Sequence, residues 1–196
     1  MSDYADLELD PRLVVGGYIE TEVALRDEAK PAVDTEGFKA AMRLLAAGVV
    51  MVTTHVEGRL WGLTISACCS LSASPPRLLI SLSHEASGRP AIIESGRFGV
   101  SILRADQRAL ADLGAVPGGP KYVDAFCESE ATGSTMLAGA LYHLDCSVDR
   151  IFDIGDHTLI IGAVEAVTPG GKPAHGSRGP LLYFDRTFHT LGEPLG

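Results

Sequence analysis

The sequence predicts a mainly β protein built on an antiparallel barrel, with a few helices packed outside it. Six or seven segments of the 196-residue chain are apolar and rich in β-branched residues, which are typical of strands. Only two or three short segments have helical periodicity. Strands do not alternate with long helices. This pattern argues against a doubly wound parallel sheet and favours a closed antiparallel one.

The first 34 residues differ in composition from the rest of the chain. Residues 1–34 are rich in acidic side chains and contain one short apolar patch, LVVGGYI. We expect an N-terminal arm that is partly extended and lies over a neighbouring subunit. A disordered leader is the alternative, and the sequence leaves both open. The folded domain is expected over residues 35–196.

The elements of this domain are predicted in order. A helix capped by Asp34 or Thr35 is expected to run to Gly48. Its apolar face consists of Phe38, Met42 and Leu45. Strands are expected over residues 49–54, 60–72, 77–83, 97–103, 140–155, 156–169 and 181–191. Short helices are expected over residues 87–96 and 106–113, and a loop rich in glycine and proline over 114–126.

Charge and hydropathy exclude several classes of function. The net charge is -9 at pH 7, and the basic residues form no cluster, so we expect no nucleic-acid partner. No apolar run approaches the roughly 18–20 residues of a membrane-spanning helix. The acidic start, MSDYADLELDP, lacks the features of a signal peptide. We therefore expect a cytoplasmic protein, outside membranes, whose four cysteines are free thiols.

The segment 60–72 carries a row of small polar side chains. In a regular strand, side chains point alternately to opposite faces. The apolar face, expected in the core, consists of Leu63, Ile65, Ala67, Cys69 and Leu71. The polar face, expected to meet a ligand, consists of Thr64, Ser66, Cys68, Ser70 and Ser72.

The adjacent cysteines in this segment do not indicate a metal site. On opposite faces, Cys68 and Cys69 cannot bind one metal together, and the chain has no CxxC pair. We expect Cys69 to be a small core residue and Cys68 to form part of the wall beside a ligand. A catalytic thiol at Cys68 is the less favoured alternative.

A second run of hydroxyl side chains ends the strand expected over residues 77–83. Ser81 and Ser83 lie in this strand, and Ser87 precedes the next helix. Hydroxyls and the amides of a helix start can bind a phosphate or a ribityl chain, and Arg89 would add a positive charge. The alternative is that Ser87 only caps its helix.

One histidine is a candidate for the reaction itself. His157 begins a strand and follows Asp156, which can orient its ring. A structural or solvated histidine is the alternative. The other histidines have no ligand spacing, so we expect no metal. The chain also lacks the GxGxxG, P-loop, GxSxG and HExxH signatures.

In combination, these segments resemble the flavin reductase-like, FMN-binding split-barrel family. The family includes the NAD(P)H:flavin oxidoreductase components of two-component monooxygenases. The resemblance covers residues 36–192 and rests on GLTISACCSLSASPP, GDH and LLYF in that order. It implies an antiparallel six-stranded split β-barrel and a homodimer with flavin near the subunit interface.

The resemblance also implies the residues of the site. His157 is implied to border the flavin and the nicotinamide. Flavin contacts are implied at Thr53, Thr54, Thr64, Ile65, Ser66, Cys68, Ser70, Ser81, Ser83 and Ser87. The chain departs from many relatives at Ser101, where they carry asparagine, and in the segment DLGAVPGGPKYVDAF. These departures leave the substrate side of the site open.

The implied reaction is hydride transfer from NADH or NADPH to FMN or FAD, with reduced flavin passing to a separate oxygenase. Such a reaction needs two rings placed face to face, and no catalytic triad. One alternative is an FMN-binding electron-transfer module with slow NAD(P)H turnover. Others are a barrel without a ligand and an oxidase of the pyridoxamine-phosphate type. A second phosphate site for that oxidase finds no support, because the candidate basic residues are scattered: Arg77, Arg89, Arg97 and Lys121.

Overall fold

The computed structural model describes residues 14–15, 18–19, 33–118, 120–127, 135–170 and 179–193. The chain divides into two compact units, Met1–Thr35 and Glu36–Gly196. In the first unit, strands β1 (Val14–Val15) and β2 (Tyr18–Ile19) pair antiparallel. Apart from Val33 and Asp34, the rest of the predicted arm lies outside the described residues.

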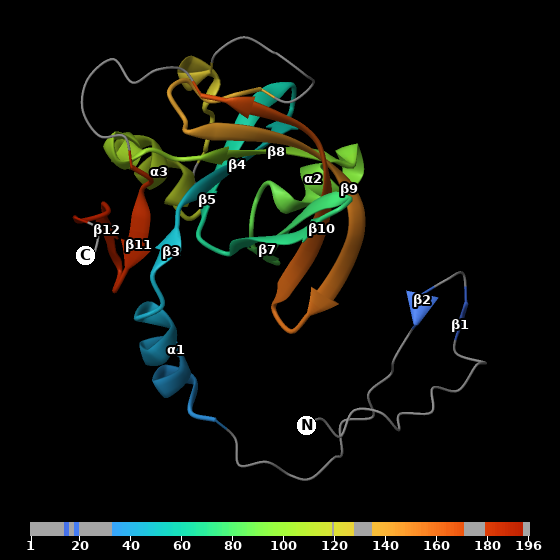
Figure 1. Ribbon diagram of the computed structural model, residues 1–196, viewed down its shortest axis with the longest axis horizontal. Helices are drawn as coiled ribbons and strands as arrows, with labels where there is room; N and C mark the ends of the chain where they lie inside the picture. Colours follow the sequence, from blue (N-terminus) through green and yellow to red (C-terminus); the bar gives the residue numbers. More distant parts are fainter. Residues whose placement is uncertain are drawn as a thin grey trace. The chain divides into compact units, whose positions relative to one another are not determined.

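The second unit is built on one antiparallel sheet of seven strands (Figure 1). Their order across the sheet is β5-β4-β8-β9-β10-β7-β6. The strands are β4 (Val50–Val56), β5 (Arg59–Ile65), β6 (Cys68–Ala73), β7 (Pro76–Ser83), β8 (Arg97–Ile102), β9 (Tyr142–Ile154) and β10 (His157–Pro169). The turn between β4 and β5 has Gly58 at a φ of 76°, as its sequence predicts.

The sheet closes into a barrel where its two edges meet. The edge strands β5 and β6 are consecutive in the chain and only Ser66 and Ala67 separate them. Three peptide steps span at most about 10 Å, so the edges lie close together at this point. The amide of Ser81 donates to the carbonyl of Ala67 (3.0 Å), which continues the pairing of β7 with β6 up to the break. The predicted antiparallel barrel is confirmed, whereas the prediction of one strand over residues 60–72 is wrong.

The break at Ser66 and Ala67 divides the expected strand into β5 and β6, which explains why the sheet has seven strands.

The core lies on both sides of β4, because Val50 and Val52 pack in one apolar cluster and Met51 in another. The first cluster fills the barrel around Phe98 and Ile80. The second lies under helix α3 (Arg108–Ala115). Burial on both faces explains why the segment VVMVTT is continuously apolar at its start.

The other helices are α1 (Thr35–Arg43) and α2 (Arg89–Ser95), with 3₁₀ turns η2 (Ala105–Gln107) and η3 (Asp124–Phe126). Helix α1 ends at Arg43, before the predicted Gly48, which belongs to strand β3 (Ala47–Gly48). Its apolar residues are exposed, with Phe38 57% and Met42 47% accessible. No helix in the described part of the chain is long and apolar enough to cross a membrane.

Two predictions near the ends of elements are wrong. Helix α2 is capped by Gly88, with no side-chain hydrogen bond, so Ser87 does not cap it. The predicted final strand is a hairpin of β11 (Leu182–Phe184) and β12 (Thr187–His189), and β11 also pairs with β3. Asp185 and Arg186 form its turn with φ of 44° and 63°. A turn with two positive φ values matches the twist of a hairpin. Such turns usually contain glycine or asparagine, so the pair Asp185-Arg186 does not mark this turn in the sequence.

Candidate functional site

A cavity of about 350 Å³ lies at the seam of the barrel. The segment 64–67 between β5 and β6 forms one wall, and Ser81 and Ser83 at the end of β7 form another. His157 at the start of β10 and Lys121 also line it. Small or apolar side chains, among them Leu63, Leu82 and Ala86, complete the lining.

The break between β5 and β6 gives this wall its chemistry. The side chain of Thr64 donates to the carbonyl of Ala111 in α3 (2.8 Å), which ties the helix to the strand. Within the described residues, the amides of Ser66 and Ala67 donate no hydrogen bond to another backbone group. Because the ladder stops here, two N–H donors lie beside the cavity.

The hydroxyl groups of β7 lie opposite the candidate histidine. Ser83 pairs with His157 in the register of β7 and β10, and paired residues of neighbouring strands point to the same face. The hydroxyl of Ser83 accepts a hydrogen bond from the amide of Glu85 (3.2 Å). The structure thus brings together the predicted residues Thr64, Ile65, Ser66, Ser81, Ser83 and His157.

The histidine is held by its neighbour in the chain. Nδ1 of His157 lies 2.7 Å from Oδ1 of Asp156, and this hydrogen bond lowers the pKa of the Asp156 carboxyl. An ionised carboxylate only accepts, so Nδ1 carries the hydrogen of this bond. The turn before it has Gly155 at a φ of 61°. The side chain of His157 is half-exposed.

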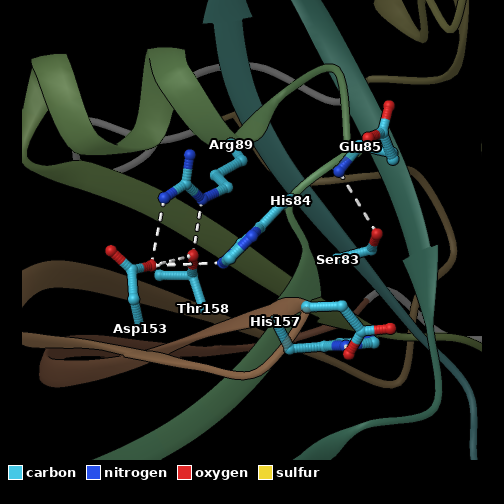
Figure 2. Close-up of polar contacts among 8 residues, drawn as sticks. Ser83, His84, Glu85, Arg89, Asp153, His157 and Thr158 are labelled. Carbon is cyan, nitrogen blue, oxygen red and sulfur yellow. Dashed lines mark hydrogen bonds and ion pairs between the residues drawn. The ribbon is translucent and has the colours of Figure 1, made fainter.

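A polar cluster surrounds Thr158, the residue that follows His157 in the strand (Figure 2). Arg89 donates to the hydroxyl of Thr158 (2.6 Å), which donates to Asp153 (2.6 Å). Arg89 and His84 also approach Asp153, at 3.1 and 3.4 Å. Figure 2 shows that the cluster lies apart from the ring of His157, because consecutive strand residues point to opposite faces. Arg89 is therefore engaged with Asp153 and Thr158.

Lys121 is the member of the cavity that sequence reasoning missed. It lies in the segment predicted as a loop, and its carbonyl accepts from the amide of Gly62 in β5 (2.9 Å). Val123 donates to Leu60 in the same way (3.0 Å), so the segment runs along the edge of β5. Lys121 is 8% exposed, and burial lowers the pKa of its ammonium group. The position of Lys121 in the cavity depends on the pairing of this segment with β5, and no local pattern in the sequence indicates that pairing.

A second cavity, of about 390 Å³, adjoins the first. Thr64, Ile65 and Ser66 line both cavities, so the two meet at the end of β5. The second cavity is also lined by the cations Arg108 and Arg186 and by the rings of Tyr183 and Phe188. Together the two cavities offer apolar walls, hydroxyls, amides and positive charge.

Five predicted flavin contacts do not line the seam cavity. Thr53 and Thr54 are buried and line another cavity, of about 140 Å³. Ser70 and Ser87 are exposed outside both seam cavities. Cys68 packs against the barrel core instead.

The predicted orientation of the two cysteines is reversed. Cys68 pairs with the fully buried Ile80 and shares its inward face, whereas Cys69 is exposed. The break at Ser66 and Ala67 resets the alternation that a continuous strand would have kept. Burial raises the pKa of the Cys68 thiol to about 11, so it is neutral at pH 7 and a poor nucleophile.

A Ser–His–Asp arrangement elsewhere in the barrel is structural. Oγ of Ser101 lies 2.9 Å from Nδ1 of His143, and Nε2 lies 3.5 Å from Asp145. At most 1% of each residue is exposed, so no substrate reaches it. Burial lowers the pKa of His143, against the opposing effect of Asp145.

Comparison with known proteins identifies the family. The model of the flavin reductase like domain matches residues 42–192, most of the chain and both cavities. The chain belongs to the flavin reductase-like family. The resemblance in the sequence is therefore confirmed.

Relatives within the flavin reductase-like family cover most of the chain. FMN reductase (NADH) RutF of Ancylobacter novellus is 34% identical over 169 residues, 85% of this chain and 91% of the relative. The styrene monooxygenase flavin reductase SMOB of Pseudomonas putida S12 has a TM-score of 0.71 and 29% identity, covering 81% of this chain and 99% of its own. The NADH:FAD oxidoreductase SgcE6 of Streptomyces globisporus, in complex with NAD and FAD fragments, has a TM-score of 0.70 and 27% identity, covering 83% and 98%.

Proposed function

We propose that this protein is an NAD(P)H:flavin oxidoreductase that transfers hydride from NADH or NADPH to FMN or FAD. The observation that carries the proposal is the cavity at the barrel seam, where the unpaired amides of Ser66 and Ala67 face the end of β7 and His157. The relatives add support, because they are named as FMN, flavin or NADH:FAD reductases.

The residues present fit a flavin. An isoalloxazine is a flat, largely apolar ring system with a polar edge, and it needs apolar walls and a few hydrogen-bond donors. Leu63, Ile65 and Leu82 supply apolar surface, and the amides of Ser66 and Ala67 supply donors. Ser81 and Ser83 would bind the polar side chain of the flavin through their hydroxyls.

The flavin supplies the redox chemistry when it is bound. The protein's share is to place the two rings in contact and to exclude water from between them. His157 lines the cavity and would hydrogen-bond the carboxamide of the nicotinamide through its imidazole ring. Asp156 holds the imidazole ring of His157 in place through its bond to Nδ1. No acid or base is required for the hydride step.

Reduced flavin would leave the site and supply a separate oxygenase. SMOB, a relative of this chain, is the flavin reductase of a styrene monooxygenase. The shallow seam, with exposed Ser66 and a half-exposed His157, suits a flavin that enters and leaves. The four cysteines, all free thiols, and the need for NAD(P)H fit a cytoplasmic location.

We further propose that the protein is a homodimer. The exposed Phe38 and Met42 of α1, with Leu45 just after it, line a hollow beside Ser66 and Tyr183, next to the second cavity. Burying this apolar face against a second copy would cover it and narrow the entrance to the site. The predicted arm, residues 1–34, would then extend over that copy. Sedimentation should give twice the chain mass of 20.6 kDa, and F38D should return it to that mass.

Steady-state oxidation of NADH and NADPH, each with FMN, FAD and riboflavin, tests the proposed activity. We expect oxidation that depends on added flavin, with one nicotinamide preferred. Tight retention of FMN with negligible turnover would instead indicate an electron-transfer module. A protein that binds no flavin would refute the proposal.

A further inference from the structure

Lys121 is a largely buried lysine in the wall of the seam cavity, with no carboxylate partner among the described residues. Among the described residues, its side chain forms no hydrogen bond and no ion pair with a carboxylate. The chain has 25 acidic and 16 basic residues, so carboxylates are plentiful. Desolvation disfavours an ammonium group, and burial accordingly lowers the pKa of Lys121. A free-energy cost of this kind is expected where a ligand brings the missing charge.

The position of Lys121 limits the kinds of ligand that could meet its charge. It lines the seam cavity together with Ser81, Ser83 and His157. The other titratable side chain lining this cavity, within the described residues, is His157, and its ring is engaged with Asp156. Lys121 is therefore the residue that supplies an ammonium group to the seam cavity. The guanidinium groups of Arg108 and Arg186 line the neighbouring cavity.

Hydride transfer creates the charge that this ammonium group would meet. The C4–H bond of the dihydronicotinamide breaks, and its hydrogen and both bonding electrons form an N–H bond at N5 of the flavin. The nicotinamide leaves as a cation, and the flavin ring system gains one negative charge. No further reactant is needed for this balance. A fixed cation in a site that excludes water stabilises such developing charge more than it stabilises the neutral ring.

We propose that Lys121 makes this site bind reduced, anionic flavin more tightly than oxidised flavin. The inference rests on the proposed function and names the residue that shifts the redox equilibrium of flavin bound at the same site. The backbone carbonyl of Lys121 accepts a hydrogen bond from the amide of Gly62 in β5. Lys121 is therefore anchored beside the wall formed by Thr64 and Ser66. Lys121 thus combines a backbone fixed by β5, a place in the wall of the cavity and a charge with no carboxylate partner among the described residues.

The test compares K121M with wild type by measuring dissociation constants for oxidised and chemically reduced FMN under anaerobic conditions. We expect K121M to bind oxidised FMN within about threefold of wild type and to lose at least about tenfold in affinity for reduced FMN. A tenfold loss corresponds to a midpoint potential of bound flavin lower by about 30 mV. K121R, which keeps the charge, should retain most of the preference.

Two controls separate this role from others. R97M removes an exposed arginine that is paired with Glu165, outside both seam cavities and α1, and should change neither constant. The melting temperature of flavin-free K121M should equal or exceed that of wild type, because the substitution removes a desolvated charge. If K121M does not fold, K121Q serves in the same measurements.

Three results would overturn the inference. Equal weakening of both redox forms in K121M would make Lys121 a general binding contact. A defect seen with FMN but absent with riboflavin would assign Lys121 to the phosphate. No change in either constant would leave it without a role in binding. In each case wild-type protein still reduces flavin, whereas a wild-type protein that binds no flavin would refute the proposed function itself.

Discussion

Replacing Gly114 with alanine should destabilise the protein, although alanine is the better helix former. Gly114 lies in α3, against strands β4 and β5. A Cβ atom added there would overlap the hydroxyl of Thr64 and lie 2.8 Å from Cε of Met51. The glycine therefore lets α3 approach close enough for Thr64 to donate to Ala111.

The expected magnitude is the balance of three contributions. Overpacking a well-packed core costs about 1–3 kcal/mol. Displacing the hydroxyl of Thr64 from the carbonyl of Ala111 costs about 1 kcal/mol more. The higher helix propensity of alanine returns about 1 kcal/mol. We therefore expect G114A to lower the free energy of unfolding by about 1–3 kcal/mol and to weaken flavin binding, because Gly114 lines the seam cavity.

Urea unfolding followed by circular dichroism measures this change. T64A should partly relieve the overlap, so the double variant T64A/G114A should cost less than the sum of the single variants. G48A is the matched control, because a Cβ on Gly48 meets nothing within 4 Å and its change should stay within about 0.5 kcal/mol. A G114A protein as stable as wild type would refute the close packing of α3 on Thr64.

Three further predictions concern the histidines and the thiols. H157A should lower kcat/KM for NADH oxidation at least about tenfold while the free energy of unfolding, measured in urea, stays within about 0.5 kcal/mol, since the side chain is half-exposed. A kcat/KM of H157A equal to that of wild type would show that His157 plays no part in the reaction. The free energy of unfolding should be highest above pH 6.5 and fall as the pH decreases, because the unfolded chain binds a proton that buried His143, with its lowered pKa, does not. Urea unfolding at pH 7.5 and 5.5 checks this, and H143Q should reduce the difference. Iodoacetamide should label exposed Cys69 before Cys68, as peptide mass spectrometry would show; the reverse order would restore the regular alternation of a single strand.

Much of the site could be predicted because it depends on local patterns. β-branched runs and turn residues mark most strands, and the Gly155 turn places His157 at the start of β10. The hydroxyl residues Ser81 and Ser83 were located by their place at the end of a strand. Periodicity of two identifies such positions as long as the strand is regular.

The errors occur where the regular pattern stops. Nothing in GLTISACCSLSASPP marks Ser66 and Ala67 as the point where the chain passes from one edge of the sheet to the other. With that break missed, Cys68 and Cys69 were assigned to the wrong faces. Thr53 and Thr54 were grouped with the site by resemblance, although they line a different cavity.

The sequence by itself determined the mainly β class, the order of the strands along the chain and the hydroxyl-rich character of the site. These properties depend on side-chain type and on spacing within single elements. Only the tertiary structure decided that the sheet closes at Ser66 and Ala67 and that Lys121 faces the same cavity as His157. Lys121 and His157 lie 36 positions apart in the sequence. Their meeting depends on how the edge of β5 pairs with a distant segment, and that pairing is set by barrel closure and core packing rather than by local pattern.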